Sequence, residues 1–301
     1  MLKLLHYDPH TAPPRDCQRA SRGRTVFGLA ALLGICLALW GCTSPLREAA
    51  KTASEGRLRP LILPGAGGLQ HQAYAREVAD GDFLTVFVEG DGSPWTGGGT
   101  RIAQDPSAKN PLSLKLAAKT PGSVLYLGRP CYLQATRDPT CSSRLWTSDR
   151  YSGEVVASMN QALRGYLSKL AASPRILLVG YSGGGTIVVL MARDLPEVTG
   201  LVTISGNLDT DAWTRVHHYV ALSNSMNPAT LGPLSPRVHQ WHLIGTRDTN
   251  VPYEAAKAYL AQPTAGQVRV YEGFDHACCW EREWPRAFAS IRAELAGYGS
   301  Q

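Results

Sequence analysis

The strongest constraint on the fold is the alternation, from residue 61 onward, of short apolar runs with segments of helical spacing. The runs expected to form strands are 61–63, 69–76, 83–88, 123–127, 175–180, 201–205, 239–245 and 268–271. The segments expected to form helices are 110–118, 154–170, 183–195, 254–260 and a closing helix that carries Trp284, Phe288, Ile291 and Leu295. This alternation predicts an α/β fold with a mostly parallel central sheet and helices on both faces. We therefore expect residues 61–301 to form one globular domain.

The distribution of charge argues against a nucleic-acid-binding surface. The formal net charge is +6, and half of it lies in residues 1–41, where five basic residues accompany two acidic ones. Beyond residue 41, Lys and Arg stand singly among acidic residues, without the basic stripe expected of a nucleic-acid binder. Metal-ligand spacing, a dinucleotide fingerprint and the Lys-Ser/Thr of a P-loop are missing from the sequence as well. We expect neither a cofactor nor a nucleic-acid partner.

The N-terminal segment has the layout of an export signal. Arg22 and Arg24 precede an apolar run that is too short to span a bilayer comfortably. The run ends in Leu-Trp-Gly-Cys at residues 39–42, which resembles the bacterial lipobox. That resemblance implies a signal peptide over residues 1–41 and a lipid on Cys42, which anchors the protein to the membrane. An uncleaved anchor and an ordinary signal peptide are the alternatives.

The residues that follow the signal predict where the protein resides. Thr43 occupies the second position of the mature chain, which in bacterial lipoproteins favours the outer membrane, facing the periplasm. Residues 42–60 are polar and show no strong apolar period, so we expect a tether between the membrane and the domain.

Cysteine usage agrees with export. Four cysteines follow Cys42, and an even number suggests disulfides in an oxidising compartment. They are Cys131, Cys141, Cys278 and Cys279. Four cysteines allow three pairings, and the sequence leaves open whether the bonds are local or join the first two to the last two.

A candidate nucleophile lies in Gly-Tyr-Ser-Gly-Gly at residues 180–184, which fits the pattern G-x-S-x-G. An apolar strand leads into this segment and an almost wholly apolar helix follows it. On such a strand-to-helix turn the serine hydroxyl stands clear of the sheet. Ser182 is therefore the expected nucleophile, and it needs a base, usually a histidine that a carboxylate orients.

The base and the acid are expected on two later loops. Of the eight histidines, His276 stands just past a late strand and before the last helix. Asp248 follows the strand before that one, which gives the chain order Ser, Asp, His. Asp209 and Asp211, after the strand at 201–205, are the alternatives for the acid.

In element order and in the positions of these three residues, the chain resembles the α/β-hydrolase superfamily, and within it the serine esterases and lipases. The resemblance implies acyl transfer through an acyl-enzyme, with a small-molecule or lipid acyl substrate. It also implies an oxyanion hole made of two backbone N–H groups, those of Gly183 and, by position, Asp91.

The loop that carries Asp91 departs from the family, because Glu89 and Asp91 would place carboxylates beside a developing anion. A carboxylate bound to Arg129 or Arg101 would remove this conflict. Two other functions stay open: a catalytically inactive hydrolase-fold lipoprotein that acts in binding or envelope assembly, and a peptidase or thioesterase with the same triad. The oligomeric state is open too.

Overall fold

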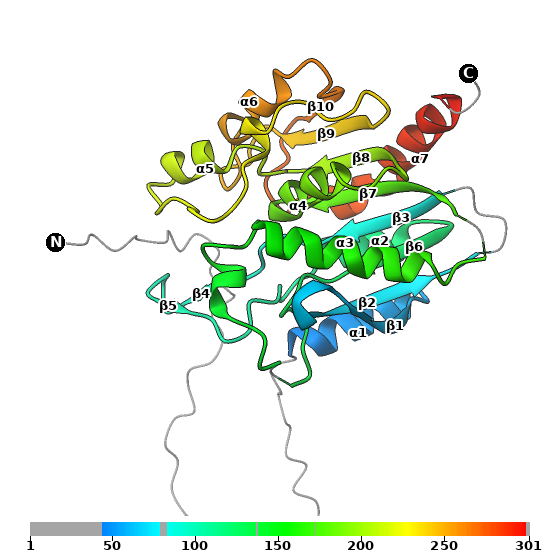
Figure 1. Ribbon diagram of the computed structural model, residues 1–301. Coiled ribbons are helices and arrows are strands. Elements are labelled where there is room, and N and C mark those ends of the chain that lie inside the picture. Colours follow the sequence, from blue (N-terminus) through cyan, green and yellow to red (C-terminus); the bar gives the residue numbers. More distant parts are fainter. Residues whose placement is uncertain (1–43, 79–82, 137, 172, 299–301) are drawn as a thin grey trace, which may run out of the picture.

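The computed structural model describes residues 44–78, 83–136, 138–171 and 173–298, and its strands and helices follow the expected alternation (Figure 1). The strands are β1 (Arg59–Pro64), β2 (Gln70–Arg76), β3 (Phe83–Val88), β4 (Trp95–Thr96), β5 (Arg101–Ile102), β6 (Ser123–Leu127), β7 (Arg175–Tyr181), β8 (Val198–Ile204), β9 (His239–Gly245) and β10 (Gln267–Tyr271). The α-helices are α1 (Pro45–Glu55), α2 (Leu112–Lys119), α3 (Gly153–Leu167), α4 (Gly183–Ala192), α5 (Thr210–Val216), α6 (Lys257–Leu260) and α7 (Trp280–Gly297). Short 3-10 turns are η1 (Ala66–Gly68), η2 (Ser143–Trp146), η3 (Pro228–Thr230) and η4 (Tyr253–Ala255).

Eight strands form one sheet in the order β1-β2-β6-β3-β7-β8-β9-β10, and β4 and β5 form a separate hairpin. β2 runs antiparallel to both of its neighbours, β1 and β6, whereas every later pair in the order is parallel. The predicted α/β class with a mostly parallel sheet is confirmed. β3 lies between β6 and β7, because the chain passes from β3 to β6 on one side and then crosses over β3 to β7 on the other. In sheets of this kind, such a switch point is where sites form, at the carboxyl ends of the strands.

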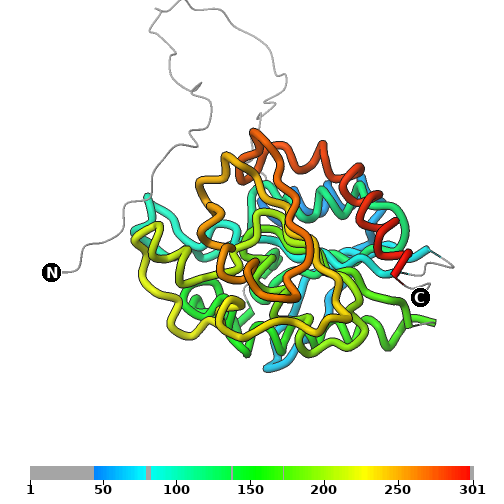
Figure 2. The backbone as a smooth tube through the Cα atoms, turned by 90° about the horizontal axis from the view of Figure 1, so that it is seen from above, coloured from blue at the N-terminus to red at the C-terminus, as the bar shows by residue number. Residues whose placement is uncertain are grey.

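Helices cover both faces of the sheet, as expected. α3 and α4 lie on one face, and α1, α2 and α7 lie on the other (Figure 1). The view from above separates the same two layers, with the red α7 on the side opposite the green α3 (Figure 2). Each layer has its own buried cluster of side chains, because β3 and β7 are apolar on both faces.

The predicted tether is wrong for residues 45–55, which form α1. Ser44 caps the helix, and Ala49, Thr52 and Ala53 are buried against α2. These side chains are small or polar, so the buried stripe leaves almost no apolar period in the sequence. The folded domain therefore begins near Ser44, before β1.

The predicted signal peptide and the lipidation at Cys42 lie outside the described residues. Among the helices that the structure describes, none combines the length and the apolar character that crossing a membrane would require.

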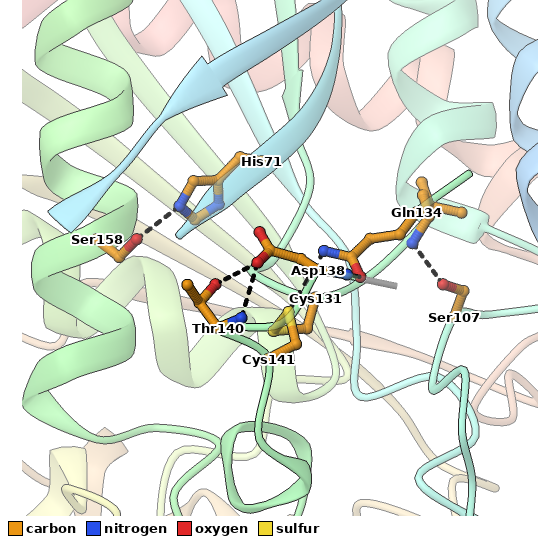
Figure 3. Close-up of a disulfide and its surroundings, with 9 residues drawn as sticks. His71, Ser107, Cys131, Gln134, Asp138, Thr140, Cys141 and Ser158 are labelled. Atoms are coloured by element: carbon orange, nitrogen blue, oxygen red, sulfur yellow. Dashed lines mark hydrogen bonds between the residues drawn. A yellow bond between two sulfur atoms is a disulfide. The ribbon is translucent and has the colours of Figure 1, made fainter. Parts of the chain in front are cut away.

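His71 on β2 joins the sheet to α3 and gives the fold a pH dependence. Its Nδ1 donates to the carbonyl oxygen of Gly128 at 2.8 Å. Its Nε2 accepts from Ser158, also at 2.8 Å (Figure 3). Burial lowers the pKa of His71 to about 4, against a smaller opposing effect of the Gly128 hydrogen bond. The unfolded chain therefore binds this proton more tightly than the folded chain does.

His71→Asn is expected to reduce the loss of stability at acid pH. The pKa of this histidine is near 6.5 in the unfolded chain and about 4 in the folded one. It therefore has almost no effect on the free energy of unfolding well above pH 6.5, but it lowers that free energy by about 2 kcal/mol at pH 5. Urea unfolding at pH 7.5 and pH 5 measures the change. The wild type should lose more free energy of unfolding between the two pH values than the variant does; an equal loss would contradict the assignment.

Candidate active site

Ser182 lies on the sharp turn between β7 and α4. Its φ is +53°, a region that side chains rarely adopt, and its N–H donates to the carbonyl oxygen of Ile204 at 2.9 Å. The flanking glycines permit the turn. A Cβ on Gly180 would lie 2.3 Å from the carbonyl oxygen of Gly184, and a Cβ on Gly184 would lie 2.3 Å from that of Val88. The sequence motif therefore meets a steric requirement of this strand-to-helix connection.

Two hydrogen bonds connect Ser182 to an acid through a histidine. His276 Nε2 lies 3.0 Å from Ser182 Oγ, and His276 Nδ1 lies 2.9 Å from Asp248 Oδ2. The carboxylate can only accept, so Nδ1 carries the proton and Nε2 is free to take one from the serine. Asp248 follows β9 and is buried, and its Oδ1 also accepts from the N–H groups of Asn250 and Val251. The structure thus brings together the three residues that the sequence placed on separate loops.

The alternative acids have other partners. Asp209 caps α5 by accepting from the N–H of Ala212, and it also accepts from Asn227. Asp211 accepts from the same Asn227 side chain. Neither carboxylate hydrogen bonds to His276, so the structure pairs this histidine with Asp248.

Hydrogen bonds within the loop that carries His276, and others from Trp280 at the start of α7, hold that loop in place. Asp275 accepts from the N–H groups of Ala277 and Cys278, and the buried Trp280 donates to the carbonyl oxygens of Asp275 and His276. The ring of His276 also packs on that of Tyr181, at 5.0 Å between centroids. These contacts hold the imidazole in one orientation between the serine and the acid.

The two disulfides within the described residues are local. Cys131 bonds Cys141 in the connection after β6 (Figure 3), and Cys278 bonds Cys279 directly after the His276 loop. Of the pairings that the sequence left open, the structure therefore has the one without a cross-link between the two regions. The described part of the chain gathers no group of three metal-ligating side chains.

The loop after β3 lies beside the serine. Val88 pairs with Gly180 in parallel register, and a Cβ on Gly90 would lie 3.1 Å from that of Ser182. The N–H groups of Asp91 and Gly183 donate to no acceptor within the described ranges. Both expected oxyanion donors therefore have no acceptor within the described protein, and they flank Ser182 in the loop after β3 and at the start of α4.

Glu89 points away from the serine, toward the start of α2. Its carboxylate accepts from the N–H groups of Gly90 and Ser113, at 3.2 and 3.0 Å. Burial raises its pKa to about 7, although these hydrogen bonds act in the opposite direction. The first of the two carboxylates expected to conflict with the oxyanion is thus bound to a helix N-terminus, which favours negative charge.

Asp91 is held by two arginines and a tyrosine. Its carboxylate oxygens lie 2.5 Å from Arg129 Nη1, 3.0 Å from Arg150 Nη1 and 2.6 Å from Tyr151 Oη. Burial alone would raise its pKa, but the charges of Arg150 and Arg129 and the hydrogen bonds outweigh burial and hold it at about 2. Arg129 is one of the two partners that the sequence suggested; Arg101, on the exposed strand β5, has no contact with Asp91.

Arg150 and Tyr151 were missed in the sequence. They stand directly before Ser152, which caps α3, and Arg129 directly follows the strand β6 and Gly128. The end of β6 and the start of α3 both lie at the carboxyl edge of the sheet, where sites form in this kind of fold. Their position after a strand and before a helix is the sequence feature that could have pointed to Arg150 and Tyr151.

No family model matches the sequence, and neither does any curated protein. Solved structures do resemble the fold. A hyperthermophilic esterase from the archaeon Pyrobaculum calidifontis superposes with a TM-score of 0.54 and 12% identity, over 85% of this chain and 92% of that one. A membrane phospholipase A described as a bacterial virulence factor superposes with a TM-score of 0.55 and 14% identity, over 84% of this chain and 92% of that one. A puromycin-hydrolysing peptidase from Mycobacterium tuberculosis superposes with a TM-score of 0.53 and 16% identity, over 81% of this chain and 39% of that one.

At these identities the likeness concerns the fold. The chain has the α/β-hydrolase fold, as its mostly parallel sheet and its structural neighbours agree. An esterase, a phospholipase and a peptidase share this fold, so it selects no substrate by itself.

Proposed function

We propose that the protein is a serine hydrolase that cleaves an ester-type acyl bond, with Ser182 as nucleophile, His276 as base and Asp248 as the acid that orients the base. The observation that carries the proposal is the continuous pair of hydrogen bonds from Ser182 Oγ through His276 to the buried carboxylate of Asp248. A binding protein has no need for a serine on a strained turn, a histidine with one tautomer fixed and a buried acid in line.

The reaction follows from these positions. His276 takes the proton of Ser182 as the oxygen attacks the acyl carbon, and Asp248 stabilises the resulting imidazolium. The N–H groups of Asp91 and Gly183 bind the oxyanion of the tetrahedral intermediate. His276 then protonates the leaving alcohol, and a water that it activates hydrolyses the acyl-enzyme.

A fluorophosphonate probe and a substrate panel test the proposal. We expect a covalent adduct on the peptide that contains Ser182, found by mass spectrometry, and faster turnover of p-nitrophenyl esters than of matched thioesters or anilides. Faster turnover of thioesters or anilides would move the assignment to a thioesterase or a peptidase. Folded protein that takes up no probe and turns over no substrate would overturn it in favour of an inactive binding protein.

A separate proposal concerns the location of the enzyme. We propose that Cys42 carries the lipid that anchors the domain in the bacterial cell envelope, at the outer membrane. The pattern at residues 39–42 supports this, and two disulfides are typical of an oxidising compartment. Metabolic labelling with a palmitate analogue, lost in Cys42→Ser, is the expected result; label that persists in the variant would contradict it.

A further inference from the structure

Five hydrogen bonds and ion pairs gather around Asp91 and its neighbours, and the serine chemistry uses none of them directly. Besides the three contacts to its carboxylate, the backbone carbonyl oxygen of Asp91 accepts from Tyr132 Oη at 3.1 Å. Arg129 in turn donates to the carbonyl oxygen of Arg150 at 2.8 Å. We call Arg129, Tyr132, Arg150 and Tyr151 the Asp91 clamp. All four side chains are buried.

The clamp touches both halves of the expected oxyanion hole. A Cβ on Gly183 would lie 2.2 Å from Asp91 Oδ1 and 2.5 Å from Tyr151 Oη. The carboxylate of Asp91 and the hydroxyl of Tyr151 therefore pack directly on the Cα atom of Gly183. The residue that supplies one N–H is thus fixed against the residue that supplies the other.

The clamp also offsets the repulsion expected between the Asp91 carboxylate and an oxyanion. Arg129 and Arg150 carry two positive charges against the single negative charge of Asp91, so these three residues together favour a nearby anion. The ring of Tyr132 and the ring of Tyr151 both contact the Arg129 guanidinium, at 5.1 and 5.6 Å from its Cζ. The arginine is therefore held by aromatic faces as well as by hydrogen bonds.

We propose that the Asp91 clamp consists of positioning residues that hold the N–H of Asp91 beside the N–H of Gly183, so that both donors meet one oxyanion. All four members come from the connection between β6 and α3, which the Cys131–Cys141 disulfide closes on itself. This connection thus acts as a support for the loop after β3. The inference rests on the proposed function, because an oxyanion hole is needed only if Ser182 attacks an acyl group.

The proposal predicts a defect that appears in the transition state rather than in substrate binding. Donors misplaced by a fraction of an ångström still admit the substrate, but they bind the oxyanion less well. A clamp variant should therefore lower kcat with little change in KM. It should also weaken a boronic acid inhibitor, whose tetrahedral adduct with the serine places an oxygen in the same hole.

Tyr151→Phe tests the clamp, since it removes one hydroxyl and keeps the ring that packs on Arg129. We expect kcat to fall about 10-fold, less than the 100-fold to 1,000-fold cost typical of losing an oxyanion donor outright. The boronic acid inhibition constant should rise by a similar factor. Tyr132→Phe, which removes the bond to the backbone carbonyl, should act in the same direction. Tyr132→Phe thus tests the positioning role independently if Tyr151→Phe folds poorly.

Tyr259→Phe is the matched control. Tyr259 is fully buried, and its hydroxyl donates to Gln240 at 2.7 Å, in a region that contributes nothing to the site. It should lose thermal stability to a similar degree while kcat and the inhibition constant stay within about twofold of the wild type. If Tyr151→Phe and Tyr132→Phe match this control, the positioning role is overturned. Failure of the wild type to form a Ser182 adduct would instead overturn the proposed function itself.

Discussion

Ser182→Ala is expected to lower kcat toward an ester by about a million-fold, because no other group in the site can form the acyl-enzyme. The hydroxyl makes one hydrogen bond, to His276, and supports no other part of the fold. The melting temperature should therefore stay close to that of the wild type. Residual turnover would come from substrate binding and from the N–H groups of Asp91 and Gly183, which the change leaves in place.

The double variant Ser182→Ala/His276→Ala makes this test sharper. Residues that act as one unit are strongly non-additive, so the second change should cost little once the first has removed the nucleophile. Steady-state rates on a p-nitrophenyl ester, with each protein purified separately, measure the four corners of the cycle. Additive losses would mean that the two residues act in different steps, and the proposed mechanism would then be wrong.

The fold could be predicted from the sequence wherever burial leaves a periodic pattern. β3 and β7 are buried on both faces and appear as continuous apolar runs, and α3 shows its apolar stripe plainly. α1 was not predicted, because Ala49, Thr52 and Ala53 are too small or too polar to mark a stripe. Its burial depends on a close approach to α2, which only the folded chain provides.

In the candidate site, too, some residues could be predicted from the sequence and others could not. Ser182, Asp248 and His276 could be proposed from sequence because each lies in the connection that follows a strand, and the carboxyl ends of parallel strands meet at one edge. Arg129 could also be suggested as a partner of a carboxylate in the Glu89–Asp91 loop, but Arg150 and Tyr151 could not, since they lie at the end of a long irregular connection. The path of that connection depends on tertiary contacts rather than on periodicity, and so does the pairing of its two cysteines.

Asp248→Asn is the second change with a large expected effect, a fall in kcat of about ten-thousand-fold. Asparagine keeps the shape of the side chain, and its carbonyl oxygen can still accept from the N–H groups of Asn250 and Val251. Its amide, however, can donate to His276 Nδ1. That bond favours the tautomer with the proton on Nε2, which cannot take the proton of Ser182.

Asp209→Asn serves as the matched control, because Asp209 is one of the two alternative aspartates, with Asp211, that the sequence offered as the acid. Asparagine caps a helix about as well as aspartate does, so α5 should persist and kcat should stay within about twofold of the wild type. The comparison is made with one ester at saturating concentration and with thermal unfolding of both variants. An equal loss of kcat in the two variants would show that the Asp248 contact to His276 is not what orients the base. A large loss confined to Asp248→Asn would locate the effect at the carboxylate that lies within hydrogen-bond distance of the imidazole.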